Sequence, residues 1–167
     1  MVTFAGFSGV GKTTVLEALV GALRRRGLRV ACVKHDGHDF SLDRPGSDSD
    51  RLTRAGAEMT ILYSATHSAI LENRPRTPET LLAAIHDVDV VLREGCKFAP
   101  GIKIGLTRGE IPLPESEERY LAVISDRPMA HRHSFSFHQT EQLADFLMQA
   151  LALNRREGAI ARMENEE

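Results

Sequence analysis

The spacing of apolar residues changes several times along the first part of the chain. Residues 2–5 (VTFA) form a short apolar run, which predicts a strand. After a glycine-rich stretch, apolar residues recur at the i, i+4, i+8 spacing of one helical face, and this spacing predicts a helix over residues 12–26 that ends at Gly27. A second strand is expected over residues 28–34 (LRVACVK).

The rest of the chain continues to alternate between strand and helix patterns. We expect a short helix over 47–55, a hairpin of strands 58–63 and 67–72, a helix over 77–86, strands over 88–92, 101–107 and 120–125, and an amphipathic helix over 140–153. Residues 135–137 (FSF) are too short a run to assign. This alternation predicts an α/β layered fold. We expect a single nucleotide-binding domain over residues 1–153 and a charged C-terminal tail over residues 154–167.

Composition and charge narrow the range of partners and locations. The chain has 167 residues and a formal net charge of −2, which gives no general attraction to nucleic acid or to an anionic membrane. No apolar run is long enough to span a bilayer, and we see no export signal. The two cysteines, Cys32 and Cys96, form no C-x-x-C pair, a usage typical of a reducing compartment. We therefore expect a cytoplasmic protein without nucleic-acid or membrane partners.

The glycine-rich stretch GFSGVGKTT, between the first strand and the first helix, matches the pattern G-x-x-x-x-G-K-[ST]. Glycines let such a loop adopt positive φ and gather its N–H groups around a phosphate at a helix N-terminus. Lys12 adds a charge for the β- and γ-phosphates, and the Thr13 hydroxyl suits Mg²⁺. The stretch predicts a P-loop NTPase-like three-layer fold with a mostly parallel, mixed sheet. The expected nucleotide-binding residues in it are Gly6, Ser8, Gly9, Gly11, Lys12, Thr13 and Thr14.

A Mg²⁺ site also needs a carboxylate, and VDVVLREG offers Asp89 and Glu94. In a parallel α/β sheet, ligands bind at the carboxyl ends of the strands. The first strand runs into the phosphate loop, so its carboxyl end is the functional edge. Asp89 begins its strand and lies at the far edge, whereas Glu94 follows it. We therefore predict that Glu94 acts with Lys12 in catalysis and with Thr13 in metal binding; an ordinary loop glutamate is the alternative.

The loop after the second strand, KHDGHDFSLDRPG, starts at the same edge. Lys34 is a further candidate for phosphate binding, and Asp36 is a candidate Mg²⁺ ligand acting through water. A transition-metal cluster of His35, His38 and Asp39 is an alternative, and so is a plain polar surface loop.

Several motifs together resemble one known family. In order, they are GFSGVGKTT, VKHDGHDF, DRPGSDSDRLTRAGA, DVVLREGCK, GIKIGLTR and AVISDRP. The chain resembles the molybdopterin-guanine dinucleotide biosynthesis protein B family over about residues 1–150. The resemblance implies a GTP-binding adaptor of molybdenum-cofactor maturation. Its implied cofactors are GTP and Mg²⁺, and its implied hydrolysis is weak. The implied partners are a second copy of the chain, the guanylyltransferase that attaches GMP to molybdopterin and, as a further candidate, molybdopterin itself.

The resemblance also places residues. It puts phosphate binding on the loop and Mg²⁺ binding on Thr13 and Glu94. The segment with Asp48, Ser49 and Arg51 matches the family, and it faces either the nucleotide or the dimer partner. The hairpin over 58–72 is apolar and short, and we expect it to help form the homodimer by joining or covering a sheet.

The chain departs from the family pattern at Arg93 and Cys96, which stand where an aliphatic and an aromatic residue are usual. It also has no N-K-x-D motif to recognise guanine. Asp126, after a strand in ISDRP, is the candidate carboxylate for the guanine N1 and N2 groups. The alternative is that Asp126 only starts the turn before Pro128.

Two other functions compete with the adaptor reading. One is a P-loop kinase that phosphorylates a small metabolite, with Arg44, Arg51 and Arg54 as lid residues. The other is a nucleic-acid-dependent ATPase, which the net charge disfavours. Neither a water-orienting glutamine nor an arginine finger is placed near the phosphate loop, so at most a slow GTPase is expected.

Overall fold

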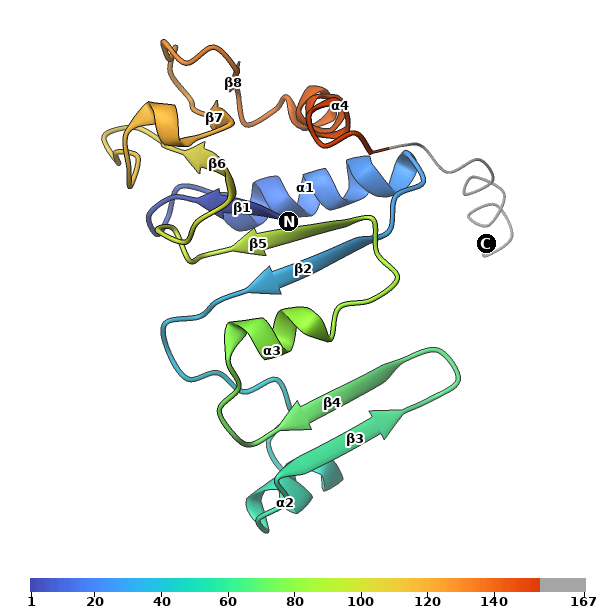
Figure 1. Ribbon diagram of the computed structural model, residues 1–167. Helices are drawn as coiled ribbons and strands as arrows, with labels where there is room; N and C mark the ends of the chain where they lie inside the picture. Colours follow the sequence, from blue (N-terminus) through green and yellow to red (C-terminus); the bar gives the residue numbers. More distant parts are fainter. Residues whose placement is uncertain (154–167) are drawn as a thin grey trace. The chain divides into compact units, whose positions relative to one another are not determined.

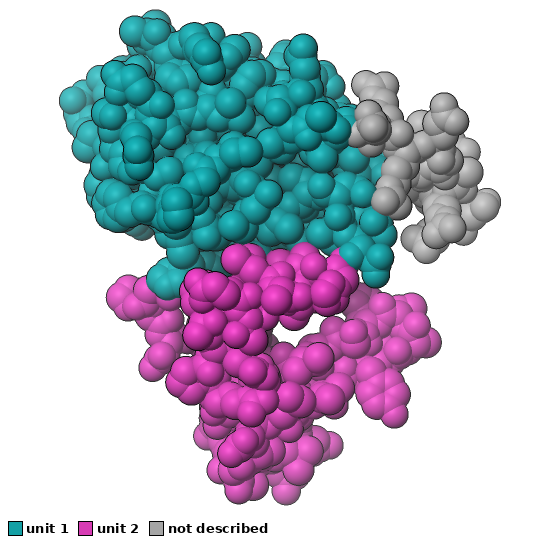
Figure 2. Space-filling view, viewed as in Figure 1, with its two compact units in different colours: residues 1–35, 87–167 teal, residues 36–86 magenta. Residues whose placement is uncertain are grey.

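The computed structural model describes residues 1–153, so the predicted charged tail over 154–167 lies outside the described residues. The chain divides into two compact units, shown in Figure 2. The sheet unit consists of residues 1–35 and the chain from residue 87 onward, and the inserted unit consists of residues 36–86. The prediction of one domain over residues 1–153 did not distinguish this insertion.

The sheet unit contains six strands in the order β2-β5-β1-β6-β7-β8, and every pairing between them is parallel. Figure 1 shows α1 and α4 lying side by side in this unit. The elements are β1 (Val2–Ala5), α1 (Lys12–Arg25), β2 (Val30–Lys34), β5 (Val90–Glu94), β6 (Ile102–Leu106), a 3₁₀ turn (Glu117–Arg119), β7 (Ala122–Ile124), β8 (Ser134–Phe135) and α4 (Thr140–Ala150).

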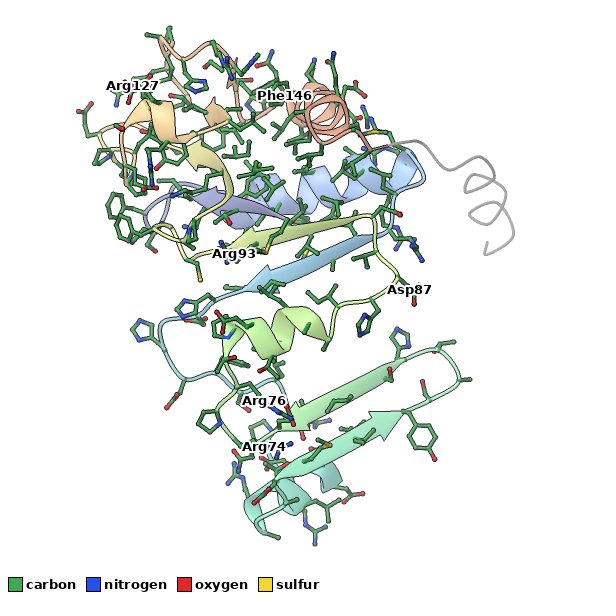
Figure 3. All side chains as sticks on the ribbon, viewed as in Figure 1. Arg74, Arg76, Asp87, Arg93, Arg127 and Phe146 are labelled. Carbon is green, nitrogen blue, oxygen red and sulfur yellow. The ribbon has the colours of Figure 1, made fainter. Side chains whose placement is uncertain are left out.

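The main core lies between one face of this sheet and the two helices. Val2 and Phe4 point to this face from β1, and both are fully buried. Leu19 of α1 and Leu143 of α4 belong to the same apolar cluster. Phe146 of α4, labelled in Figure 3, packs against Phe135 with 5.4 Å between ring centroids. This packing fixes α1, and with it the loop that precedes α1.

The opposite face of the sheet carries a buried polar row. Thr3 is paired with Arg93 of β5 and Lys103 of β6, and all three residues are buried. The Arg93 guanidinium donates to the Thr3 hydroxyl at 3.0 and 2.7 Å, and Lys103 pairs with Glu115. The amine of Lys103 holds the pKa of the Glu115 carboxyl below its usual range. A buried cation is tolerated only with such partners.

The inserted unit contains α2 (Asp48–Arg54), the antiparallel hairpin β3–β4 (Met59–Tyr63 and Ser68–Glu72) and α3 (Pro78–Ala83). The Ser47 and Thr77 hydroxyls cap the two helices by accepting backbone N–H bonds of 3.1 and 3.3 Å. Figure 3 labels Arg74 and Arg76, which both donate to Glu72 at the end of the hairpin. These bonds lower the pKa of Glu72 to about 2.

Most predicted elements are confirmed, with shifted ends. The helix predicted over 77–86 ends at Ala83, and the strand predicted over 88–92 runs from Val90 to Glu94. The strand starts late because the N–H groups of Asp89 and Val90 both donate to the Arg29 carbonyl, outside the regular ladder. The main sheet is wholly parallel rather than mixed, since the antiparallel pair forms a sheet of its own. No helix within residues 1–153 is long and apolar enough to cross a membrane.

The first prediction tests the core beneath the phosphate loop. Leu19→Ala empties a fully buried site on α1, so the free energy of unfolding should fall by about 2–5 kcal/mol. Leu81→Ala makes the same change at an exposed position of α3 and should cost no more than about 0.5 kcal/mol. Urea unfolding followed by circular dichroism measures both. Equal losses for the two variants would contradict the core assignment.

Candidate functional site

The loop from Gly6 to Gly11 joins the carboxyl end of β1 to the N-terminus of α1. Gly9 and Gly11 adopt φ of +82° and +93°, which side chains other than glycine rarely do. Gly6 is required for space, because a Cβ there would lie 2.9 Å from the Leu106 carbonyl oxygen. The loop therefore has the glycine conformations and the position before a helix N-terminus that phosphate binding would need, and its phosphate role stays a prediction.

Lys12 spans this loop from its position at the start of α1. Its amine donates to the Phe7 carbonyl at 2.8 Å. Burial lowers the pKa of Lys12, Glu94 opposes this effect, and the nearby charges of Lys97 and Lys34 lower the pKa further. Lys97 also lies with its amine 4.4 Å from the centroid of the Phe7 ring. Lys34 and Lys97 thus lie close enough for their charges to act on Lys12, an arrangement suited to a polyphosphate.

Thr13 and Glu94 meet at the same edge of the sheet. The Thr13 hydroxyl lies 3.2 and 3.0 Å from the two Glu94 carboxylate oxygens and donates to the carboxylate. Glu94 is the last residue of β5, paired with Phe4 of β1. A hydroxyl and a carboxylate beside a phosphate loop are the oxygen ligands that Mg²⁺ uses in P-loop proteins. The residues therefore fit a magnesium ion.

Asp89 lies at the opposite edge, as the strand direction predicted. Its carboxylate accepts the Arg29 backbone N–H at 2.7 Å and lies 3.5 Å from the Arg29 guanidinium. Through these contacts Asp89 links the start of β5 to the segment before β2. It lies at the amino end of β5, whereas the phosphate loop lies at the carboxyl end of the sheet.

The turn after β5 is held against the end of β2. The His35 N–H donates to the Glu94 carbonyl at 3.0 Å, and a Cβ on Gly95 would lie 3.0 Å from the His35 carbonyl oxygen. Gly95 and Cys96 both have positive φ, of +88° and +50°. The turn precedes Lys97, whose amine lies over the Phe7 ring. Cys96, which departs from the family pattern, therefore occupies a conformation that side chains rarely adopt.

The loops after β6 and β7 are joined by Asp126. Both of its carboxylate oxygens accept the Gly109 N–H, at 3.0 and 3.1 Å. In the turn before Pro128, the side chain that accepts a backbone N–H is Ser125 and not Asp126: the Ser125 hydroxyl accepts the Arg127 N–H at 3.0 Å. Asp126 is exposed and keeps unused lone pairs. Its predicted role toward guanine stays a prediction.

A cavity of about 470 Å³ opens at the carboxyl ends of β6 and β7. Its wall includes the hydroxyl residues Thr107 and Ser125, the apolar residues Leu113 and Met129, and Arg127, which is labelled in Figure 3. This size is within the range of small-molecule sites.

The remaining predicted site residues are less informative. Ser8 and Thr14 lie exposed on the phosphate loop and at the start of α1, and Lys34 ends β2. Asp36 begins the inserted unit, where its carboxylate accepts the His38 N–H at 3.3 Å, and its metal role stays a prediction. The alternative of a transition-metal cluster at His35, His38 and Asp39 is not supported, because residues 1–153 contain no metal-binding group of three such side chains.

Two residues at the site were missed by the sequence analysis. Lys97 could have been predicted from the sequence, since it follows Glu94 by three residues in the EGCK motif. Arg108 could not have been predicted, because it reaches Gly11 from the loop after β6 and only the tertiary structure brings these two residues together.

Comparison with known proteins tests the resemblance. The sequence model of the family described as molybdopterin guanine dinucleotide synthesis protein B, MobB, matches residues 1–126. The chain belongs to the MobB family. It is 40% identical over 150 residues to the molybdopterin-guanine dinucleotide biosynthesis adapter protein of Haemophilus influenzae, covering 85% of this chain and 84% of the relative. It is 37% identical over 160 residues to the Escherichia coli adapter protein, covering 89% and 91%.

The MobB fold is also present. The crystal structure of Bacillus subtilis MobB superposes with a TM-score of 0.67 at 26% identity, covering 89% of this chain and 95% of that one. The predicted α/β fold and the predicted family are therefore confirmed.

The second prediction separates the two candidate acids. Glu94→Gln removes the carboxylate beside Thr13, so Mg²⁺-dependent nucleotide binding should weaken by about 10- to 100-fold. Asp89→Asn is the matched control, since it neutralises an acid of the same strand region at the far edge, and it should leave binding unchanged. Calorimetric titration with GTP and Mg²⁺ measures both. A larger loss in Asp89→Asn would overturn the assignment of the functional edge.

Proposed function

We propose that this MobB-family protein is an adaptor that binds GTP with Mg²⁺ during the synthesis of molybdopterin-guanine dinucleotide. Membership of a family whose curated relatives are named adapter proteins supports the role. The contact of Thr13 with Glu94 next to the glycine loop is the observation that carries the nucleotide chemistry.

The nucleotide would be held by the loop amides and by the lysines around them. Lys12, Lys34 and Lys97 supply three positive charges toward the phosphates of GTP. Thr13 and Glu94 would hold Mg²⁺, which neutralises phosphate charge when it is bound. Asp126 keeps acceptor sites for the N1 and N2 donors of guanine.

Slow hydrolysis is part of the proposal. The chain has no glutamine before Gln139, and the Gln139 side chain accepts the Ser136 N–H at 2.7 Å. Rapid GTP hydrolysis in P-loop proteins needs a group that orients the attacking water. A protein that holds GTP without converting it quickly suits delivery to a partner, and the proposed partner is the guanylyltransferase, with molybdopterin as a further ligand. The reducing cytoplasm remains the proposed location, in keeping with two free cysteines.

The kinase alternative gains no support from two of its three candidate lid arginines. Arg51 lies 3.5 Å from the Asp48 carboxylate, and Arg54 lies 3.0 Å from that of Asp50. Both arginines are thus partly neutralised by acids of their own helix, whereas a phosphoryl clamp needs free cations.

A homodimer is proposed on the face of the β3–β4 hairpin. Ile61 and Ile70 lie directly opposite each other in the register, and they are 58% and 64% exposed. Met59 and Tyr63 extend the same face of β3, and both are exposed. The other face has Thr60, which is buried and whose hydroxyl lies 3.1 Å from that of Thr53 in α2. An apolar sheet face of this kind favours association with a second copy.

The third prediction tests nucleotide binding and its purpose together. Lys12→Ala removes the cation that spans the loop, so affinity for GTP should fall by about 2 kcal/mol or more while the fold persists. Wild-type protein should increase the output of guanylyltransferase supplied with molybdopterin, Mg²⁺ and limiting GTP, and Lys12→Ala should not.

Calorimetry and cofactor yield report the two effects separately. Unchanged GTP binding in Lys12→Ala would refute the phosphate site. No effect of the wild-type protein on cofactor yield at any GTP concentration would refute the adaptor role while leaving the binding site intact.

The fourth prediction concerns assembly. Ile70→Lys places a charge in the centre of the exposed hairpin face and should convert the dimer to a monomer. Leu81→Lys introduces the same charge at an exposed leucine of α3 and should leave the dimer intact. Light scattering after size exclusion at tens of micromolar gives the mass. A monomeric wild-type protein would contradict the proposal.

A further inference from the structure

Arg108 is held beside the phosphate loop by an aromatic ring. It follows β6 by two residues, and its guanidinium carbon lies 3.9 Å from the centroid of the Phe137 ring. A Cβ built on Gly11 would lie 3.3 Å from Nη2 and 3.5 Å from Cζ of Arg108. The absent side chain of Gly11 therefore provides the space that the guanidinium occupies, besides allowing the φ of +93°.

The charge of Arg108 is not neutralised by an acid. Within residues 1–153, no carboxylate forms an ion pair with it, whereas Arg127 pairs with Glu110 and Arg26 with Glu141. Arg108 is exposed in spite of its contact with Phe137. An arginine stacked on an aromatic ring keeps its charge and loses part of its rotamer freedom before any ligand arrives.

The two sides of the phosphate loop differ in chemistry. On the β5 side, Thr13 and Glu94 form the metal-binding pair, with Lys97 in the following turn. On the β6 side lie Arg108 and the Gly109 N–H, which is bonded to Asp126. β1, which leads into the phosphate loop, lies between β5 and β6. The terminal phosphates suit the β5 side, where the metal-binding pair lies, and the nucleoside suits the β6 side.

We propose that Arg108 is the platform against which the purine base of the nucleotide packs, with the Asp126 carboxylate at the edge of the base. This inference rests on the proposed function, since it assigns a further residue to the same nucleotide site. A planar, delocalised guanidinium stacks on flat π systems, and a purine is such a system. The bond from Gly109 to Asp126 links the residue next to the platform with the carboxylate that would read guanine. The two contacts to the base are therefore positioned together.

The test compares a ligand that has a base with one that has none. Wild-type and variant proteins are titrated with GTP and with inorganic tripolyphosphate, both with Mg²⁺. Arg108→Ala should weaken GTP binding by about tenfold more than it weakens tripolyphosphate binding, on the scale of one lost base stack. Arg108→Lys should show the same selective loss, because it keeps the charge without the planar group.

Arg24→Ala is the matched control. It removes one exposed arginine from the last turn of α1, which at 1.5 Å per residue lies about 18 Å along the helix from Lys12. It should change neither affinity.

Four results would overturn the inference. Equal losses for both ligands in Arg108→Ala would make Arg108 a phosphate ligand, and no loss for either would make it a bystander. If wild-type protein binds tripolyphosphate as tightly as GTP, the base adds nothing and the platform is refuted while phosphate binding stands. If wild-type protein binds neither ligand, the proposed function fails and the platform fails with it.

Discussion

The parallel pairing of β1 with β5 is the constraint on which the site depends. It places Glu94 opposite Phe4, one residue before Ala5 ends β1, so the carboxylate reaches the Thr13 hydroxyl on the first turn of α1. An antiparallel or shifted pairing would move Glu94 away from this edge. The pairing is in turn held by the core, because the buried residues Val2 and Phe4 fix which face of β1 meets α1.

The same edge gathers groups from several strands. β2 ends in Lys34, β5 ends in Glu94 and leads to Lys97, and the loops after β6 and β7 contribute Arg108 and Asp126. Side chains that are far apart in sequence are therefore gathered at one edge of the sheet, the edge at which ligands bind in parallel α/β folds. The buried row of Thr3, Arg93 and Lys103 lies on the face away from the main core, so its charges do not disturb the packing that sets the edge.

The sequence predicted the parts of the site that local patterns encode. The glycine loop is a local motif, and Glu94 could be chosen over Asp89 because strand direction follows from the position of that loop. Arg108 was missed because its partner Phe137 is distant in sequence, and stacking leaves no periodic signal. The division into two units was also missed, since the hairpin and short helices of residues 36–86 show the same strand and helix patterns as the rest of the chain.

We propose that the glycine loop, Thr13 and Glu94 together form a magnesium-dependent nucleotide site. Calorimetric titration of the wild-type protein with GTP, with Mg²⁺ and then with excess EDTA, tests it most directly. We expect one GTP bound per chain in the presence of Mg²⁺ and much weaker binding after chelation. Absence of binding, or an affinity that chelation leaves unchanged, would contradict it.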